Sequence, residues 1–581
     1  MIRNTLDPAF LRQQIVGIDT MIPTPFGERP MVYCDYTASG RCLRFVEAYL
    51  QGIQRVYANT HTEDDISGRS MTRLLHQAEA AIKRSVNAGP GGRIIACGTG
   101  ATGAIDKLQQ IIGVALAPAS RQHLLRIVDE SDLDGAAFRR ALEALQPVVF
   151  VGPYEHHSNE LMWRQSLART VEVRLDANGH LDLAHLEALL RDPAHRNRMR
   201  IGSFSAASNV TGLLTDVRAV ASLLHRHGAL ACFDFAACAP YVAIDMNPAP
   251  LGADDDPSID AIFVSPHKFI GGPGSSGVLV FNERIYHREL PPSVSAGGTV
   301  DYVGMEDQDY IADIEEREKA GTPGVLQTLK AALVFQIKDR IGADLVMARE
   351  HALTTRAMER WGCDGRIEVL GDPDPRHRVG IISFNVRDPH GRYLHHKFVT
   401  ALLNDLFGIQ SRAGCSCAGP YGHRLLGIDE PTSERYRTVV RGGRGGIKPG
   451  WCRIGLHWVM DDAEADYVIE AVRFVAQHGH RYLALYDFDL TTGTWSHRGV
   501  SIELPNWSLD DAIAGPKPES PALPAAEREQ MYARYLSEAN DWARRLEARP
   551  ELPQAALERE LGDLLFFTPP AVAGGERQER R

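Results

Sequence analysis

The sequence predicts an α/β protein whose main part is a large, mostly parallel sheet with helices on both faces. From about residue 31 to residue 340, short apolar stretches that suit strands alternate with helical stretches such as 74–86 and 217–227. Glycine-rich loops follow several of the apolar stretches, and ligands of such sheets bind beyond the carboxyl ends of the strands. From about residue 341 a helix leads into a smaller α/β part.

We expect four regions along the chain. They are an N-terminal arm (1–30), a large domain (31–340), a smaller α/β domain with a strand at 379–386 and helices at 397–406 and 463–476 (341–485), and a C-terminal extension (486–581). The extension is expected to hold a hairpin (485–497), a proline-rich linker (516–524), a charged helix (526–549) that ends before Pro550, and a tail from residue 568 with the composition of a disordered segment.

The composition is typical of a cytoplasmic enzyme. The 581 residues exceed the usual length of one domain, and a hydrophobic content of 44% is ordinary for a globular protein. A net charge of −11 argues against nucleic acid as the main partner. The sequence has no apolar run that could span a membrane and no signal-peptide core at its start, and its nine cysteines lack disulfide-like spacing.

Lys268 is the most informative residue of the chain. It lies in residues 263–280, which read as a strand, a tight glycine-rich loop and a second strand. A lysine at the tip of a buried strand is costly unless its charge is used, and a Schiff base with pyridoxal phosphate (PLP) is one such use. Ser265 and His267 are donors that suit a phosphate. The alternative is a surface lysine in an ordinary turn.

Two polar residues follow strands upstream of this lysine. Asp234 ends the apolar stretch 229–234, where its carboxylate would keep the pyridinium nitrogen of PLP protonated. Asn209 follows the stretch 200–204 and is placed to donate to the 3′-oxygen of the ring. The alternatives are a helix N-cap for Asp234 and a plain turn residue for Asn209.

Six short segments occur in the order of a known set of motifs. They are YCDYTAS (33–39), CGTGATGAI (97–105), EHHSN (155–159), the Lys268 segment (263–280), REKAGTP (317–323) and SRAGCSCAGP (411–420). On these motifs the chain resembles the class V aminotransferases of PLP fold type I, and within them the cysteine desulfurase/selenocysteine lyase branch. The resemblance covers about residues 32–472. It implies a large, mostly parallel seven-stranded sheet domain and a smaller α/β C-terminal domain.

The resemblance also implies roles at the cofactor. Gly100, Ala101 and Thr102 stand between a strand and a helix, where backbone N–H groups and a hydroxyl would bind the PLP phosphate. His156 would stack on the pyridine ring and shuttle a proton, unless it is a core histidine. In the family the threonine that matches Thr322 reaches the phosphate of the other subunit, which implies a homodimer.

Cys417 is expected to decide the reaction. In the enzymes that this chain resembles, the matching cysteine attacks the sulfur of the bound amino acid and becomes a persulfide, which a sulfur-acceptor protein can receive. Its neighbour Cys415 could act as a second thiol. Cys417 could instead be an incidental buried cysteine. A zinc site of Cys415, Cys417, Cys452 and His457 is disfavoured because C-x-C is a poor chelate, so no metal is expected.

Two arginines are expected to bind the amino acid. Arg453 matches the family arginine that holds the substrate carboxylate, for which a planar guanidinium fork is suited. Arg412, in the cysteine segment, is the second candidate, and its charge would also favour the thiolate of a nearby cysteine. The alternative for Arg453 is an arginine of a surface strand in an ion pair.

The chain departs from the family pattern at four places. Ala237 stands where the family has a glutamine, and Gly103 stands where it has a glutamate. Residues 247–257 are predicted to be an insertion, and residues 421–449 form an extra basic, glycine-rich segment after the cysteines. That segment could cap the site, order around a sulfur acceptor or be a plain surface loop.

Three functions stay open from the sequence. The first is a PLP-dependent cysteine desulfurase or selenocysteine lyase that uses Cys417 and forms alanine. The second is an aminotransferase, lyase or epimerase of the same family in which Cys417 is not the nucleophile. The third is a non-catalytic partner protein, which the intact set of Lys268, Asp234 and His156 disfavours.

Overall fold

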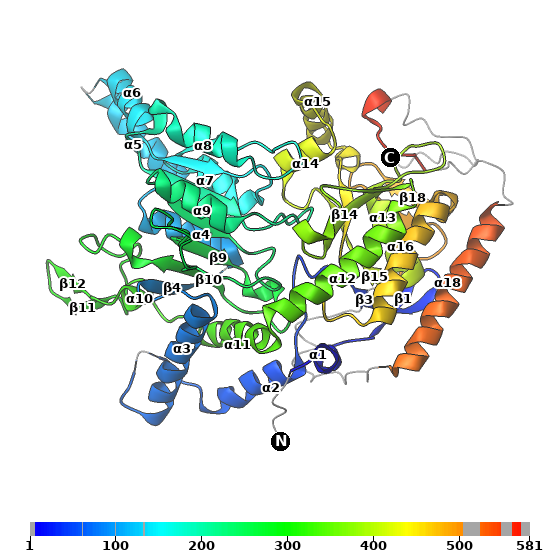
Figure 1. Ribbon diagram of the computed structural model, residues 1–581, viewed down its shortest axis with the longest axis horizontal. Coiled ribbons are helices and arrows are strands. Elements are labelled where there is room, and N and C mark those ends of the chain that lie inside the picture. The colour runs from blue at the N-terminus through cyan, green and yellow to red at the C-terminus, as the bar shows by residue number, and fades with distance from the viewer. Residues whose placement is uncertain are drawn as a thin grey trace, which may run out of the picture. The chain divides into compact units, whose positions relative to one another are not determined.

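The structure is a computed structural model that describes residues 6–60, 62–98, 100–131, 134–502, 523–547 and 561–570 (Figure 1). It contains two compact units. The first comprises Met1–Asp7, Thr37–Ala348 and His377–Val379, and the second comprises Pro8–Tyr36, Arg349–Arg376 and Gly380–Arg581. The four regions expected from the sequence remain a proposal beside this division. The predicted linker, up to residue 522, and most of the predicted disordered tail, from residue 571, lie outside the described residues, as does Thr99 of the second motif. The sequence predicts that tail from residue 568, but Thr568 is buried and donates to Asp388 at 2.6 Å, so that boundary is wrong.

A seven-stranded sheet forms the centre of the first unit, in the order β4-β10-β9-β8-β7-β5-β6. The strands are β4 (Gly92–Cys97), β10 (Gly277–Asn282), β9 (Ala261–Val264), β8 (Leu230–Asp234), β7 (Arg200–Ser205), β5 (Val148–Val151) and β6 (Arg169–Glu172). Strand β10 is antiparallel to both of its neighbours, and the remaining pairs are parallel. The predicted α/β fold with a mostly parallel seven-stranded sheet is therefore confirmed.

Helices and short segments connect these strands. The helices are α2 (Arg44–Ile53), α3 (Ile66–Ser85), α4 (Gly100–Ile111), α5 (Pro118–Glu130), α6 (Gly135–Leu145), α7 (Leu161–Gln165), α8 (Leu183–Arg191), α9 (Val217–Arg226), α10 (Ile314–Arg317) and α11 (Val325–Ile341), and the small hairpin is β11 (Val300–Val303) with β12 (Gln308–Tyr310). The helices expected at 74–86 and 217–227 are present as parts of α3 and α9. Helix α11 packs along α3 (Figure 1).

The core of the first unit lies where helix α4 packs on the sheet. Ala101, Ala104 and Leu108 of α4 are buried in one cluster with Phe263 of β9 and Leu279 of β10. The alanines let the helix approach the strands closely, because they carry only a methyl group. This packing fixes the first turn of α4 beside the ends of β9 and β10, where the candidate cofactor residues lie.

The second unit is built on a smaller antiparallel sheet in the order β13-β14-β17-β16. Its strands are β13 (Ile367–Val369), β14 (Ile381–Val386), β17 (Trp451–Gly455) and β16 (Arg412–Gly414), and the further pairs are β1 (Met21–Thr24) with β2 (Gly27–Pro30), β3 (Val32–Tyr33) with β15 (Ile409–Gln410), and β18 (Tyr486–Asp489) with β19 (Thr494–His497). The last pair is the hairpin that the sequence predicts at 485–497.

Six helices belong wholly to the second unit among its described residues. They are α1 (Pro8–Gln14), α13 (His396–Phe407), α14 (Gly419–Leu425), α15 (Glu430–Arg441), α16 (Asp462–Tyr482) and α18 (Ala525–Glu547), and α12 (Ala343–Gly362) contributes its residues from Arg349 onward. Helix α18, the predicted charged helix, packs against α16 (Figure 1). The extra segment at 421–449 is mostly helical, so its interpretation as a plain loop is wrong. No helix of the described residues combines the length and apolar character needed to cross a membrane.

Candidate active site

Lys268 and Asp234 lie at the carboxyl ends of neighbouring parallel strands. Asp234 is the last residue of β8, and Lys268 ends the short helical turn Pro266–Lys268 that follows β9. Burial raises the pKa of Asp234, while the nearby Lys268 ammonium acts in the opposite direction. An oxygen of Asp234 also accepts a hydrogen bond from the backbone N–H of Ala236 at 2.8 Å. The predicted pair is therefore electrostatically coupled, with Asp234 buried and Lys268 half-buried.

The turn that carries Lys268 is held by a close backbone approach. The N–H of Gly40 donates to the carbonyl of His267 at 2.8 Å, and the N–H of Gly271 donates to the carbonyl of Arg41 at 2.6 Å. A Cβ on Gly40 would stand 1.9 Å from the carbonyl oxygen of Phe269, so only glycine fits there. The lysine is thus presented by a rigid turn.

The start of α4 meets the segment that precedes Lys268. Gly100 has a φ of +60°, and a Cβ there would stand 2.7 Å from Ser265 Oγ and 2.8 Å from a ring carbon of His267. The backbone N–H of Ala101 donates to Ser265 Oγ at 2.8 Å. Burial and the charge of Lys268 lower the pKa of His267 to about 4, so its ring is neutral near pH 7. The predicted phosphate residues thus form one small cradle of N–H and hydroxyl groups, which suits the phosphate of PLP.

A chain of hydroxyl contacts joins this cradle to His156. Thr102 Oγ1 and Ser158 Oγ lie 2.7 Å apart, and Ser158 Oγ lies 3.1 Å from Nδ1 of His156. His156 is half-buried and precedes the turn His157–Asn159. Its link to the first turn of α4 supports a position beside the cofactor.

Asn209 and Thr322 occupy different settings in the first unit. Asn209 is buried in a turn after β7 in which Ser208 Oγ accepts from the N–H groups of Val210 and Thr211. Thr322 is exposed before α11, and its hydroxyl oxygen accepts from the side-chain amide of Asn59 at 3.3 Å. Their roles at the ring oxygen and at a partner's phosphate stay predictions.

Glu155 is a buried acid. It belongs to the motif at residues 155–159, but no role was predicted for it from the sequence. Its Oε1 accepts from the backbone N–H groups of Gly152 and Ser205, and its Oε2 accepts from the Ser205 hydroxyl at 2.6 Å and from the Asn159 amide at 2.7 Å. Burial raises its pKa to about 7. Glu155 ties the ends of β5 and β7 together directly before His156. The sequence did hold a signal for a role of Glu155, because an acid next to two histidines directly after an apolar strand is typical of a functional site.

In the second unit, the two candidate substrate arginines share one carboxylate. Arg412 and Arg453 face each other on the antiparallel strands β16 and β17. Asp35 accepts from Arg453 at 3.0 Å through Oδ1 and from Arg412 at 2.9 Å through Oδ2. Arg453 is 5% exposed, so it is not an arginine of a surface strand. The group carries a net charge of +1, which suits one substrate carboxylate.

The segment with the two cysteines forms a tight turn. The N–H of Ala418 donates to the carbonyl of Cys415 at 3.1 Å, and the two residues between them, Ser416 and Cys417, both have positive φ, 51° and 57°. This is the pattern of a type I′ turn, which non-glycine residues adopt at a cost of about 1–3 kcal/mol each. The indole N–H of Trp451 donates to Ser416 Oγ at 3.2 Å and holds the turn. Cys417 is exposed at its tip.

The zinc alternative finds no support in this geometry. Burial raises the pKa of Cys452 to about 11, and its sulfur contacts the hydroxyl of Thr400 instead of another thiol. His457 is buried, with a pKa lowered to about 3, and its ring stacks on Tyr36 at 4.0 Å. Among the described side chains, no cluster of metal-binding groups contains a cysteine.

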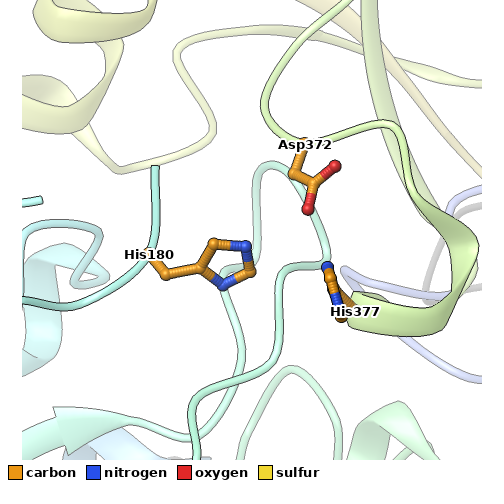
Figure 2. A group of neighbouring side chains, drawn as sticks. All are labelled: His180, Asp372 and His377. Carbon is orange, nitrogen blue, oxygen red and sulfur yellow. The ribbon is translucent and has the colours of Figure 1, made fainter. Parts of the chain in front are cut away.

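Other histidines of the first unit also lie near polar groups. His180 and His377 lie with ring centroids 5.3 Å apart in an edge-to-face contact (Figure 2). Asp372, also labelled there, belongs to the second unit. His76 lies 3.4 Å from Glu316, and both Glu316 and Glu79 accept from the Lys319 ammonium. That ammonium bridges the two carboxylates, so this cluster is an ion-pair network.

The comparison with known proteins identifies the family. A family model of the class V aminotransferases matches residues 138–468, more than half of the chain. The chain belongs to the class V aminotransferase family. Members of this family are PLP-dependent enzymes, and the resemblance that the sequence motifs carry is confirmed.

Named relatives of the family are similar to this chain over most of their length. A probable cysteine desulfurase of Halalkalibacterium halodurans is 27% identical over 396 residues, which cover 67% of this chain and 85% of that protein. The apo structure of a cysteine desulfurase from Thermococcus onnurineus NA1 is 20% identical, with a TM-score of 0.58, and covers 77% of this chain and 94% of that one. The cysteine desulfurase CsdA from Escherichia coli is 19% identical, with a TM-score of 0.58, and covers 81% and 98%. The two structures agree with the class V fold.

Proposed function

We propose that this chain is a PLP-dependent cysteine desulfurase or selenocysteine lyase in which Cys417 takes up the sulfur. The observation that carries the proposal is the turn at Cys415–Ala418, because it presents an exposed thiol in a strained backbone conformation of the kind that persists at functional sites. The relatives named above as cysteine desulfurases support the same chemistry.

PLP fits the residues of the first unit. Lys268 would hold it covalently, Gly100, Ala101 and Thr102 with Ser265 and His267 would bind its phosphate, and Asp234 would lie at the pyridine nitrogen with Asn209 at the ring oxygen and His156 on the ring face. When bound, PLP supplies an electron sink for bonds at the substrate. A buried carboxylate beside the lysine is what that chemistry requires of the protein.

The residues of the second unit would bind the amino acid and accept its sulfur. Arg453, oriented by Asp35, would hold the substrate carboxylate, with Arg412 beside it. The Cys417 thiolate would attack the substrate sulfur, so that a sulfur–sulfur bond forms as the carbon–sulfur bond breaks. The carbon receives a proton, and the products are alanine and a Cys417 persulfide. The step is therefore balanced in atoms and in electrons.

Three further expectations belong to this proposal. Thr322 would contribute to the phosphate site of a second copy, so the enzyme would be a homodimer of the 64.0 kDa chain. A sulfur-acceptor protein would discharge the persulfide. The compartment would be the cytoplasm, and the nine free cysteines support a reducing environment.

Replacement of Cys417 by serine tests the proposal. A hydroxyl cannot hold a persulfide, so C417S should release no alanine from cysteine and should carry no extra sulfur by mass spectrometry, while PLP absorbance stays intact. Cys415→Ser is the matched control, because it changes the neighbouring thiol of the same turn, and it should retain a first turnover. Lys268→Ala should lose the visible absorbance of the bound cofactor.

The outcomes separate the three functions. If C417S forms alanine as fast as the unchanged enzyme, Cys417 is not the nucleophile. Turnover of another amino acid by that variant would indicate an aminotransferase, lyase or epimerase. A protein that takes up no PLP when excess cofactor is offered would be a non-catalytic member of the family.

A further inference from the structure

Residues 561–568, which we call the strap, pack on the extra segment that follows the cysteines. Leu561 and Leu564 of the strap are buried in one apolar cluster with Tyr436 of α15 and Ile447 of the turn Gly445–Ile447. Half-buried apolar residues complete this cluster; they are Ile428, Val439, Val440, Leu490, Leu565 and Phe566. Residues more than a hundred positions apart thus share a core.

Polar contacts set the register of the strap on α15. Arg435 donates to both carboxylate oxygens of Asp563, one of them at 2.8 Å. The hydroxyl of Tyr436 donates to the backbone carbonyl of Leu564 at 3.2 Å. A bidentate pair fixes orientation as well as distance, although an exposed pair adds little stability by itself. The strap therefore meets α15 in one defined position.

The far end of the strap is anchored on the body of the second unit. Phe567 is fully buried, and its ring lies 4.6 Å from that of His395 and 5.3 Å from that of Phe488. Thr568 donates from its N–H to the carbonyl of Tyr393 at 3.0 Å and from its hydroxyl to Asp388 at 2.6 Å. The strap is thus fixed beyond the apolar cluster as well as within it.

His395 joins this anchor to the extra segment. Its Nδ1 accepts from the N–H of Lys397, so the other ring nitrogen carries the proton and donates to the carbonyl of Gly446 at 3.0 Å. Burial lowers the pKa of His395 to about 4, so the ring is neutral near pH 7. A neutral ring can accept from Lys397 and donate to Gly446 at the same time. One buried side chain therefore contacts both Phe567 and the turn that follows α15.

A short relay joins α15 to the cysteine turn. The Nδ1 of His423 in α14 donates to the carbonyl of Gly419 at 2.7 Å, so its Nε2 accepts from the hydroxyl of Ser433 in α15 at 3.0 Å. Helix α14 begins at Gly419, two residues after Cys417. The relay therefore joins α15 to α14, whose N-cap residue Ala418 is the residue on which the type I′ turn closes.

We propose that the strap is a positioning element for Cys417: it holds α15, and through α14 it keeps the cysteine turn in place. The role in sulfur transfer rests on the proposed function, whereas the effect on the turn does not. The strap lies in the C-terminal extension, beyond residues 138–468 that the family model matches, and α15 lies in the extra segment at 421–449.

Hydrogen exchange on the full-length protein with PLP tests this proposal. Leu564→Asp places a charge in the apolar cluster, and Phe567→Ala removes the ring that packs against His395 and Phe488. Both should speed amide exchange in residues 415–425 by about tenfold or more, because local opening of α14 becomes easier. Val500→Asp is the control, since it makes the same kind of change at an exposed position of the extension. It should leave exchange unchanged, and Leu564→Met should behave as the unchanged protein.

Persulfide formation gives the second readout. The two strap variants should form the Cys417 persulfide at least about tenfold more slowly while the KM for cysteine changes little, since Arg453 and Asp35 are intact. Unchanged exchange in residues 415–425 of the strap variants would overturn the proposal, and so would an equal increase in exchange in the Val500→Asp control. Faster exchange with normal persulfide formation would also overturn the positioning role. If the wild-type protein forms no persulfide but the strap variants still show faster exchange in residues 415–425, only the proposed function is refuted.

Discussion

At the scale of single residues, Glu155 combines two opposing influences on its charge. Burial raises its pKa to about 7, yet all four of its hydrogen-bond partners are donors. A carboxylate accepts at both oxygens, so these partners favour the ionised form. The assignment of Asn159 as a donor is firm because its oxygen accepts from Trp163 and Ser203. Glu155 is therefore a buried acid between two strand ends and next to His156, and its hydrogen bonds favour the ionised form against the effect of burial.

Glu155→Gln should damage the site although the side chain keeps its shape. The amide nitrogen of glutamine would face a donor, and a buried unsatisfied group costs about 1–3 kcal/mol. We expect a lower thermal midpoint and weaker PLP binding, measured by thermal unfolding and by a spectroscopic PLP titration. Glu143→Gln on the exposed surface of α6 is the control. Wild-type PLP affinity in the Glu155 variant would show that this acid does not support the site.

At the scale of elements, the strand pair β16 and β17 places two arginines side by side. Their partner Asp35 comes from the N-terminal part of the chain, just after β3. Three elements that are distant in sequence thus form one charged group, in which Asp35 lies 3.0 Å from the buried Arg453 guanidinium. Without Asp35, the buried charge of Arg453 would lack compensation, whereas Arg412 is exposed.

Asp35→Asn should weaken both the second unit and the binding of substrate. Loss of one partner of a buried ion pair costs about 3–5 kcal/mol, and Arg453 would also lose its orientation. We expect a lower unfolding midpoint and a higher KM for the amino acid, with a smaller change in kcat. Asp487→Asn, which affects an exposed pair with Arg498, should change stability by less than about 1 kcal/mol. Equal effects of the two substitutions would contradict the assignment of Asp35.

At the scale of the whole molecule, buried titratable groups set the pH dependence of stability. Burial raises the pKa of Glu350 to about 8, and its oxygens accept from the N–H groups of Gly380 and Trp458. Its folded pKa is above the unfolded value, so its contribution is complete below about pH 4.5 and is lost as pH rises through about 8. His395 and His457, whose pKa values burial lowers, are neutral in both states above about pH 7.

Between pH 7 and 8 the unfolding free energy should therefore fall with a slope of up to about 1.4 kcal/mol per pH unit from Glu350. Glu350→Gln should be less stable overall, because its amide cannot accept from both N–H groups, but it should lose this slope. Urea unfolding at pH 7.0, 7.5 and 8.0 checks the expectation. The same slope in both proteins would mean that Glu350 titrates near its ordinary pKa.

Much of the fold and of the cofactor site followed from the sequence, because the signals are local. The alternation of apolar and helical stretches predicts the sheet of the first unit, and each motif, such as the one around Lys268, lies within one strand and its loop. Residues placed at the carboxyl ends of parallel strands must gather at one edge, so Asp234 and the Lys268 turn were predicted together before any contact was known.

The tertiary structure decided which charges and side chains pair over long separations. Asp35 with Arg453, Glu155 with Ser205, and the strap with Tyr436 join residues that no periodicity relates. Such contacts depend on the order of the strands in the sheet and on where a C-terminal segment packs against earlier helices. Local sequence propensity predicts neither of these. The sequence by itself therefore determined the family and the sheet and placed the candidate residues of each motif, whereas packing determined the ion pairing of Arg412 and Arg453 with Asp35 and the contacts of the strap with α15.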